Sequence, residues 1–217
     1  LDLVLKPDNT PSNYPGKHTS KRENQVKSVA VFCGASMGNS EEIKNAAQQM
    51  GELIAKAGLT LVYGGGRVGL MGVVADAALS QGGTVVGVIP KFMSDREIAH
   101  SGLSELIIVE TMHERKAIMA NRSDAFLAMP GGYGTLDELC EILTWYQIGL
   151  HKRPIGILNT MGYFDSLLGF FDDAVKNGFI PANLRAILLE SSTPEQRLKQ
   201  LADHHRESLN HESFARG

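Results

Sequence analysis

Cysteines and long apolar runs are both scarce in this sequence, and each shortage excludes a class of protein. The 217 residues include two cysteines, Cys33 and Cys140, and no CxxC pair, which argues against a disulfide framework or a cysteine-ligated zinc site. Isolated cysteines of this kind are typical of buried thiols in a reducing compartment, so we expect a cytoplasmic protein. No apolar run approaches the roughly 18 residues that a membrane span requires.

An excess of positive charge is also missing. The formal net charge is −3 at pH 7, so no general basic field attracts nucleic acid or an anionic membrane, and neither is expected as a partner. Hydrophobic residues make up 43% of the chain and charged residues 21%, which is typical of soluble globular proteins. The length suits one α/β domain with a sizeable core.

The two ends differ in composition from the rest of the chain. Residues 1–26 are rich in Pro, Asn, Ser and Lys and lack the apolar core of a signal peptide, so we expect a flexible N-terminal arm there. The domain is predicted to span residues 27–206, and residues 207–217 are predicted to form a C-terminal tail.

Short apolar runs alternate with helical patterns along the domain. The runs are rich in Val, Ile and Leu without clean alternation, which is typical of parallel strands covered on both faces; they occupy 28–33, 59–63, 84–89, 105–110, 124–129 and 153–158. Helices are expected at about 43–57, 69–80, 112–122, 135–150, 163–178 and 193–205. Asn39 and Glu42 suggest a capping box for the first helix, and Gly58 its end. Strand and helix in repetition predict an α/β fold, a single Rossmann-like doubly wound parallel sheet flanked by helices.

Three glycine-rich turns follow the first, second and fifth predicted strands. They read CGASMG (33–38), GGGRVGLMG (64–72) and PGGYGT (130–135). Ligands of such sheets bind at the carboxyl ends of the strands, and glycine turns before helices present backbone N–H groups to phosphate. We therefore expect one nucleotide-sized site, whose candidate substrate- or phosphate-binding residues in these turns are Gly34, Ser36, Gly65, Gly66, Gly131, Gly132, Gly134 and Thr135.

Other motif matches in these segments are weak. GGGRVG formally fits G-x-G-x-x-G, but the tip of the next strand, VIPKF, offers no acid to a ribose, which disfavours a dinucleotide site. GASMG formally fits the nucleophile elbow G-x-S-x-G, but one strand precedes it and no later strand end offers a histidine, which disfavours a serine hydrolase. MHERK lacks the second histidine of H-E-x-x-H, which excludes a zinc peptidase.

Charged residues stand beside two of the predicted strand ends. Arg115 begins a helix shortly after a strand, and a guanidinium there can hold phosphate bidentately. Asp137, Glu138 and Glu141 follow the third glycine turn. The helix dipole accounts for one or two such acids, at about 0.3–1 kcal/mol each. It does not account for three acids beside a predicted phosphate site.

The third turn also carries a family signature. PGGYGTLDE fits P-G-G-x-G-T-x-x-E, and VFCGAS, LVYGGGRVGLMG, GVIPKF, MHERKA, DAFLAMPGGYGT and ILTWYQIGLHKRPIGILN follow in the family's order. These segments resemble the LOG ("lonely guy") family of cytokinin-activating phosphoribohydrolases, whose members have often been mislabelled lysine decarboxylases. The similarity covers about residues 27–201.

The resemblance implies a Rossmann-like homodimer that uses no metal or organic cofactor. It implies hydrolysis of N6-substituted adenosine 5′-monophosphates to the free base and ribose 5-phosphate. The implied catalytic residues are Arg115 and Glu138, and the implied phosphate site consists of Gly131, Gly132, Gly134 and Thr135.

Three charged neighbours complete the candidate site. Lys116, Asp137 and Glu141 are expected to contact the substrate or to support Glu138. Asp137 stands where relatives commonly carry Glu, a change that keeps the charge.

Two alternative functions remain open at this point. One is a general AMP or purine nucleotide nucleosidase in salvage, and the other is a non-catalytic protein that binds a nucleotide or the molybdenum cofactor. Arg115 together with Glu138 argues against the second, because a binder needs no carboxylate beside a phosphate. Lysine decarboxylation would require pyridoxal phosphate on a lysine, and neither Lys91 nor Lys116 has a recognisable setting for it.

Overall fold

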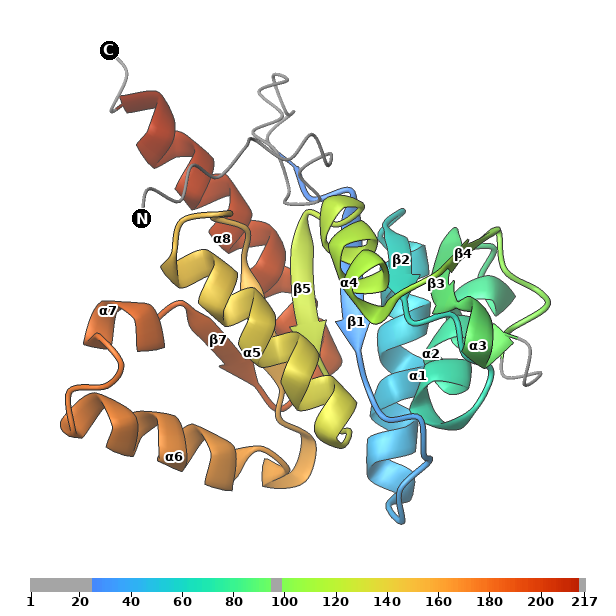
Figure 1. Cartoon of the computed structure of the whole chain (residues 1–217), viewed down its shortest axis with the longest axis horizontal. Coiled ribbons are helices and arrows are strands. Elements are labelled where there is room, and N and C mark those ends of the chain that lie inside the picture. The colour runs from blue at the N-terminus through green and yellow to red at the C-terminus, as the bar shows by residue number, and fades with distance from the viewer. Residues whose placement is uncertain (1–24, 95–98, 215–217) are drawn as a thin grey trace, which may run out of the picture.

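Seven parallel strands form one sheet in the part of the chain that the computed structural model describes, residues 25–94 and 99–214 with side chains up to His205 in the last helix. The strand order is β4-β3-β2-β1-β5-β6-β7 (Figure 1). The strands are β1 (Ser28–Phe32), β2 (Thr60–Tyr63), β3 (Val85–Pro90), β4 (Glu105–Val109), β5 (Ala125–Ala128), β6 (Ile155–Leu158) and β7 (Leu188–Ser191). The parallel α/β fold expected from the sequence is confirmed.

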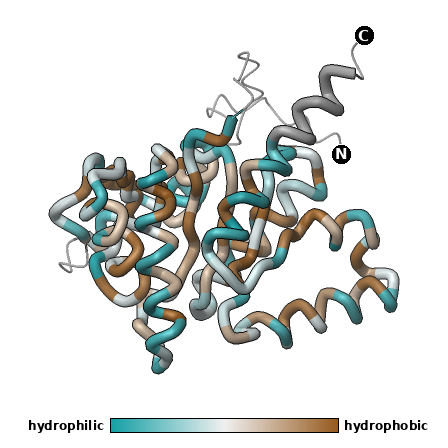
Figure 2. The backbone as a smooth tube through the Cα atoms, turned by 180° about the vertical axis from the view of Figure 1, so that it is seen from behind, coloured by the Kyte–Doolittle hydropathy of each residue, from teal (hydrophilic) through white to brown (hydrophobic). Residues whose placement is uncertain are grey.

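Helices cover both faces of this sheet. One face packs on α1 (Glu41–Lys56), α2 (Gly69–Ser80) and α8 (Pro194–Phe214), and the other on α4 (Met112–Asn121), α5 (Tyr133–Gln147) and α6 (Asp165–Lys176). Along β1, Val29 and Val31 face the first group, whereas Ala30 and Phe32 face the second. Because both faces are buried, the strands read as continuous apolar runs, which is visible as hydrophobic stretches in the central strands of Figure 2.

The remaining elements are short. They are α3 (Lys91–Ser94), α7 (Ala182–Arg185) and the 3₁₀ turn η1 (Thr160–Gly162). In the described part of the chain, no helix combines the length and apolarity that crossing a membrane requires.

The order of the strands fixes where a ligand can bind. The chain passes from β1 outward to β4, returns to β5 on the other side of β1, and continues to β7. The strand order therefore reverses between β1 and β5, and ligands of open α/β sheets bind at the carboxyl ends of the strands at such a point.

Several element boundaries differ from those expected. The N-cap of α1 is Ser40, whose side chain accepts a hydrogen bond from the Ile43 amide, so the expected capping box of Asn39 and Glu42 is wrong by one residue. Helix α5 begins two residues earlier than expected and ends at Gln147. Strand β7 was not among the expected strands.

The structure describes little of the expected arm and only part of the expected tail. Residues 1–24 of the arm and residues 215–217 of the tail lie outside the described residues. The last helix continues to Phe214 and so crosses the boundary expected at residue 206.

Candidate active site

A buried ion pair joins the two helices that flank the reversal of strand order. Arg115 Nη2 lies 3.0 Å from Glu138 Oε1, and their side chains are 11% and 8% exposed. Arg115 lies in the first turn of α4, whose start is fixed by a capping box between Thr111 and Glu114. Glu138 lies in the second turn of α5. The sequence motifs predicted both residues, and the structure brings them together.

The guanidinium of Arg115 is oriented by the backbone around it. Its Nε donates a hydrogen bond to the Val88 carbonyl of β3, at 3.2 Å. A Cβ at Gly64 would lie 2.2 Å from Arg115 Nη2, so any side chain there would displace the guanidinium. Gly64 therefore belongs to the site, although the sequence argument selected only its neighbours. The only sequence signal for Gly64 is its place at the start of GGGRVG.

Burial governs the charge state of Glu138. Burial raises the pKa of Glu138, the Arg115 charge opposes the rise, and Asp137 reinforces it. The nearby Cys33 thiol is buried as well, and both its burial and the charge of Glu138 raise its pKa. A carboxylate kept in a dry setting beside one fixed cation is suited to stabilise a transient positive charge.

The glycine turns after β1 and β5 meet beside this pair. The Gly34 amide donates a hydrogen bond to the Pro130 carbonyl at 3.0 Å. A Cβ at Gly131 would lie 2.1 Å from Thr135 Oγ1 and 2.7 Å from the Gly34 nitrogen. Gly131 is therefore a glycine because the two turns and the threonine hydroxyl pack against its Cα.

Thr135 carries an unused polar atom in this turn. Its residue is 2% exposed, and its hydroxyl is buried without a hydrogen-bond partner among the described residues. It lies in the first turn of α5, next to the amides that a helix N-terminus leaves free. A hydroxyl and free amides at one helix end form a ready anion site.

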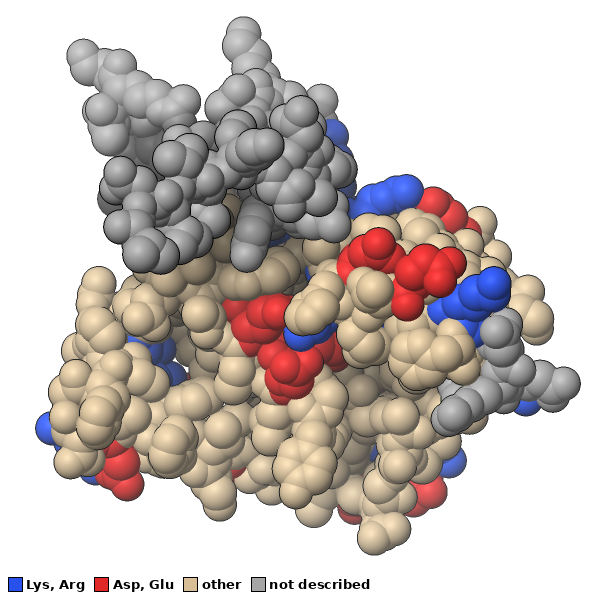
Figure 3. Space-filling view, in the orientation of Figure 1, with Lys and Arg blue, Asp and Glu red and all other residues tan. Residues whose placement is uncertain are grey.

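Lys116 forms a second link between α4 and α5. Its Nζ lies 3.1 Å from Asp137 Oδ2 and 3.1 Å from Glu141 Oε1. Figure 3 shows acidic side chains gathered around a basic one over α5 and next to α4. Because α5 begins at Tyr133, these acids lie beyond its first turn, where the helix dipole has little effect.

The remaining predicted residues lie in neighbouring turns. Gly65 has φ 73°, and its carbonyl accepts a hydrogen bond from the His100 amide at 2.9 Å. Gly66 forms an isolated bridge with Ala99. Ser36 is exposed, and its carbonyl would lie 3.0 Å from a Cβ at Gly34. These contacts place the three residues in the turns that follow β1 and β2.

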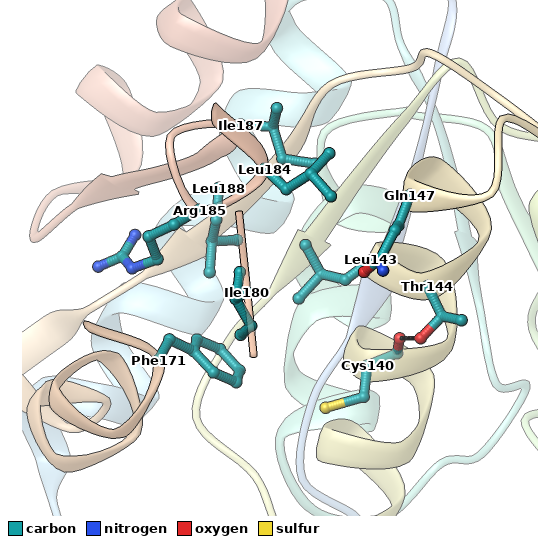
Figure 4. A pocket seen from close by; sticks show the side chains of 10 residues that line it. All are labelled: Cys140, Leu143, Thr144, Gln147, Phe171, Ile180, Leu184, Arg185, Ile187 and Leu188. Atoms are coloured by element: carbon teal, nitrogen blue, oxygen red, sulfur yellow. Dashed lines mark hydrogen bonds between the residues drawn. The ribbon is translucent and has the colours of Figure 1, made fainter. Parts of the chain in front are cut away.

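A separate apolar pocket lies on another side of α5. It has a volume of about 150 Å³ and separates α5 from α6, α7 and β7 (Figure 4). It is lined by Cys140, Leu143, Thr144, Gln147, Phe171, Ile180, Leu184, Arg185, Ile187 and Leu188. None of the predicted site residues is in its lining.

Within the described ranges, no group of three or more His, Cys, Asp or Glu side chains is arranged to hold a metal ion. The two acids beside Glu138, Asp137 and Glu141, both pair with Lys116, whereas Glu138 pairs with Arg115.

Together, the fold and site define a class: an α/β protein with a glycine-rich turn beside a buried arginine–glutamate pair at the reversal of strand order. A family model described as "possible lysine decarboxylase" matches residues 71–201. Cytokinin riboside 5′-monophosphate phosphoribohydrolase LOG1 of Arabidopsis thaliana is 46% identical over 182 residues, 84% of this chain and 85% of that protein. Probable cytokinin riboside 5′-monophosphate phosphoribohydrolase LOGL1 of Oryza sativa subsp. japonica is 47% identical, over 82% of this chain and 80% of that protein. The chain belongs to this LOG family.

Solved structures share the fold at lower identity. The Moco carrier protein from Chlamydomonas reinhardtii has a TM-score of 0.61 and 22% identity, covering 80% of this chain and 96% of that one. The molybdenum cofactor binding protein from Rippkaea orientalis has a TM-score of 0.59 and 23% identity, covering 81% and 93%. At these identities the likeness concerns the fold alone.

Proposed function

We propose that this protein hydrolyses the N-glycosidic bond of N6-substituted adenosine 5′-monophosphates, the cytokinin nucleotides, to the free base and ribose 5-phosphate. The observation that carries this proposal is the buried pair of Arg115 and Glu138 beside the turn from Gly131 to Thr135. The names of the relatives at 46% and 47% identity support the substrate class.

The phosphate end of the substrate is assigned to the start of α5. Gly131, Gly132 and Gly134 present backbone amides, and Thr135 presents a hydroxyl without a partner in the described part of the chain. Gly34 and Ser36 border this turn, and Gly65 and Gly66 complete the rim. Binding of the phosphate, which does not react, holds the ribose in register with the carboxylate.

The ribose end is assigned to the ion pair. Breaking the bond between C1′ and the base nitrogen builds positive charge on the ribose, and the Glu138 carboxylate stabilises that charge. Glu138 also accepts the proton of the water whose oxygen bonds to C1′ and then returns it to solvent, and the departing base takes up a proton from solvent. Arg115 anchors the substrate and opposes the negative charge on the leaving base.

This mechanism has a defined pH dependence. Glu138 acts as a carboxylate, and burial raises its pKa above the ordinary 4.5. The rate therefore falls as pH decreases through this raised pKa, so the acidic limb of kcat lies above the range of an exposed glutamate.

Lysine decarboxylation is not favoured by the lysine at the site. Burial lowers the pKa of Lys116, but its contacts with Glu141 and Asp137 outweigh that effect and the pKa is raised. A lysine that forms a Schiff base needs a neutral amine, and Lys116 is held as a cation.

The proposal is tested by incubating the protein with isopentenyladenosine monophosphate and, separately, with AMP, and by measuring the free base chromatographically. Release of base with a higher kcat/KM for the prenylated nucleotide supports the proposed function. Equal values would support the general purine nucleotide nucleosidase. Tight binding of AMP with no base released from either nucleotide would support the non-catalytic carrier and refute the enzyme.

We further infer a homodimer in the cytoplasm. The segment LTWYQIGL (143–150) spans the end of α5 and carries Ile148, which is 64% exposed. Phe170 on α6 is 65% exposed, and Phe179, shortly after α6, is 83% exposed. Exposed apolar side chains of this size favour burial against a partner, and a second copy of the chain is the partner that the family resemblance implies.

A further inference from the structure

Two consecutive residues of α4 form ion pairs with different residues of α5. Arg115 pairs with Glu138, and Lys116 pairs with both Asp137 and Glu141, one residue before and three residues after Glu138. The Lys116 side chain is 12% exposed, about as buried as that of Arg115 at 11%. An exposed lysine gains little from an ion pair, because ordering its flexible side chain costs entropy. Lys116 is instead largely buried and contacts two carboxylates.

The charges of this cluster nearly balance only when Lys116 is included. Arg115 and Lys116 contribute two positive charges, and Asp137, Glu138 and Glu141 contribute three negative ones, so the sum is −1. Without Lys116 the sum is −2, and two carboxylates without a cation stand beside the buried one. Like charges this close disfavour ionisation of the group that is least solvated, and that group is Glu138 at 8% exposed.

We propose that Lys116 is a positioning residue, which neutralises Asp137 and Glu141 and ties α4 to α5 so that Glu138 stays ionised and in register with Arg115. The proposal rests on the proposed function for its consequence in catalysis. Lys116 acts through its neighbours, because its Nζ is paired with two carboxylates.

The groups that face Glu138 all bear on its charge. Burial raises the pKa of Glu138 first of all, and the cations of α4 oppose the rise whereas the acids of α5 reinforce it. The remaining facing group is the neutral thiol that follows β1. The set comprises Arg115, Lys116, Asp137, Glu141 and Cys33. Removal of Lys116 takes away one opposing cation and exposes Glu138 to both acids, so the pKa of Glu138 rises further.

The test compares three changes at the cluster. Lys116→Met should move the acidic limb of the kcat–pH profile up by about one pH unit, which lowers kcat about tenfold at pH values below both midpoints. The KM should change less than twofold, whereas a lysine that bound the phosphate directly would raise KM. Lys116→Arg should restore most of the rate. The triple variant Lys116→Met, Asp137→Asn, Glu141→Gln removes the acids along with the cation, so its acidic limb should return toward that of the unsubstituted protein.

Lys56→Met is the matched control. Lys56 pairs with Glu52 near the end of α1, so the change removes the same charge and one ion pair at a distance from the site. Its kcat–pH profile should match that of the unsubstituted protein. Circular dichroism and thermal melting of every variant check that the fold is kept.

A second readout needs no substrate. Isotope-edited infrared titration of protein labelled with 13C-glutamate, with Glu138→Gln subtracted, reports the midpoint of the Glu138 carboxyl. An upward shift of this midpoint in Lys116→Met supports the positioning role, whether or not the protein turns over a nucleotide. Absence of turnover would refute the proposed function alone. An unchanged midpoint in folded Lys116→Met overturns the positioning role, as does a triple variant that behaves like the single one.

Discussion

The pairing of Arg115 and Glu138 places two charges where little water reaches them. Burying a charge is expensive unless it is paired, and the 3.0 Å contact together with the hydrogen bond to the Val88 carbonyl supplies that pairing. Charged side chains are often buried at this cost in active sites, where they act on charge that develops during the reaction. This cost favours a functional rather than a stabilising role for the two side chains.

Replacement of the carboxylate tests that value directly. Glu138→Gln keeps the size of the side chain and removes its charge, so we expect kcat to fall by about 100- to 1000-fold, the usual loss when one electrostatic stabiliser is removed. The measurement is release of free base at pH 7. The control is Glu52→Gln on α1, which pairs with Lys56 outside the site. Near-normal turnover by Glu138→Gln would assign the chemistry to Asp137 or Glu141.

The packing at Gly131 gives a second test. Gly131→Ala places a methyl group 2.1 Å from Thr135 Oγ1 and 2.7 Å from the Gly34 nitrogen, so the threonine hydroxyl must move. Loss of one hydrogen bond to a charged group costs about 1.5–3 kcal/mol, so we expect KM to rise at least tenfold. Gly134→Ala is the comparison, because a Cβ there meets nothing within 4 Å. A KM that rises equally in both variants would contradict a steric cause.

Site residues that belong to a sequence motif could be predicted from the sequence. Site residues whose role depends on a tertiary contact could not. The resemblance to the family identified Arg115, Glu138 and Thr135, because these residues stand at matching positions of the family's motifs. Gly64 escaped notice because its role depends on a side chain 51 positions away, where Arg115 Nη2 would meet its Cβ. The partners of Lys116 escaped notice for the same reason, because their contact depends on how α4 and α5 pack.

At the scale of elements, the joint between α5 and β6 (Ile155–Leu158) depends on one histidine. His151 Nε2 lies 3.0 Å from the Ile142 carbonyl of α5, and its Nδ1 accepts a hydrogen bond from the Arg153 amide at 3.2 Å. The residue is 7% exposed. The two contacts require a neutral ring with the proton on Nε2, because a proton on Nδ1 would face the Arg153 amide.

This requirement makes the stability of the protein sensitive to acid. Burial, with a smaller effect of the Arg153 charge, lowers the pKa of His151 from 6.5 to about 4. Between these values the unfolded chain binds a proton that the folded chain does not, so stability is lost as pH falls from about 6.5 to about 4. The loss amounts to about 3 kcal/mol. His151→Gln keeps a donor for Ile142 and should lose markedly less stability over this window in urea unfolding; an equal loss would contradict the assignment.

The elements themselves followed from periodicity where their apolar pattern was long. Helix α2 (Gly69–Ser80) has the expected bounds, and six of the seven strands lie within or overlap the expected runs. Strand β7 (Leu188–Ser191) was missed because half of its four residues, Glu190 and Ser191, are polar. Arg197 of α8 was equally unpredictable. It is fully buried over Gly156, whose missing side chain makes room for it.

At the scale of the whole molecule, the strand order decides which loops meet. The sequence predicted turns at the carboxyl ends of strands but could not show that β1 and β5 are neighbours. That pairing, from Val29 with Ala125 to Phe32 with Ala128, brings together turns that are about a hundred residues apart. The hydrogen bond from Gly34 to Pro130 is its direct result. Long-range pairing of this kind depends on the packing of the entire sheet and leaves no local pattern.

The outer surface carries the last prediction, which concerns assembly. We expect the protein to have twice the chain mass by light scattering coupled to size-exclusion chromatography. A standard interface buries roughly 800 Å² on each partner, and Ile148, Phe170 and Phe179 are among the most exposed large apolar side chains of the described residues. Ile148→Asp places a charge at one of these exposed apolar positions and should yield the monomer mass. Ile108→Asp on β4 (Glu105–Val109), a site that is 55% exposed at the opposite edge of the sheet, should leave the dimer intact. A monomeric unsubstituted protein would refute the dimer, and loss of the dimer in Ile108→Asp alone would move the interface to β4.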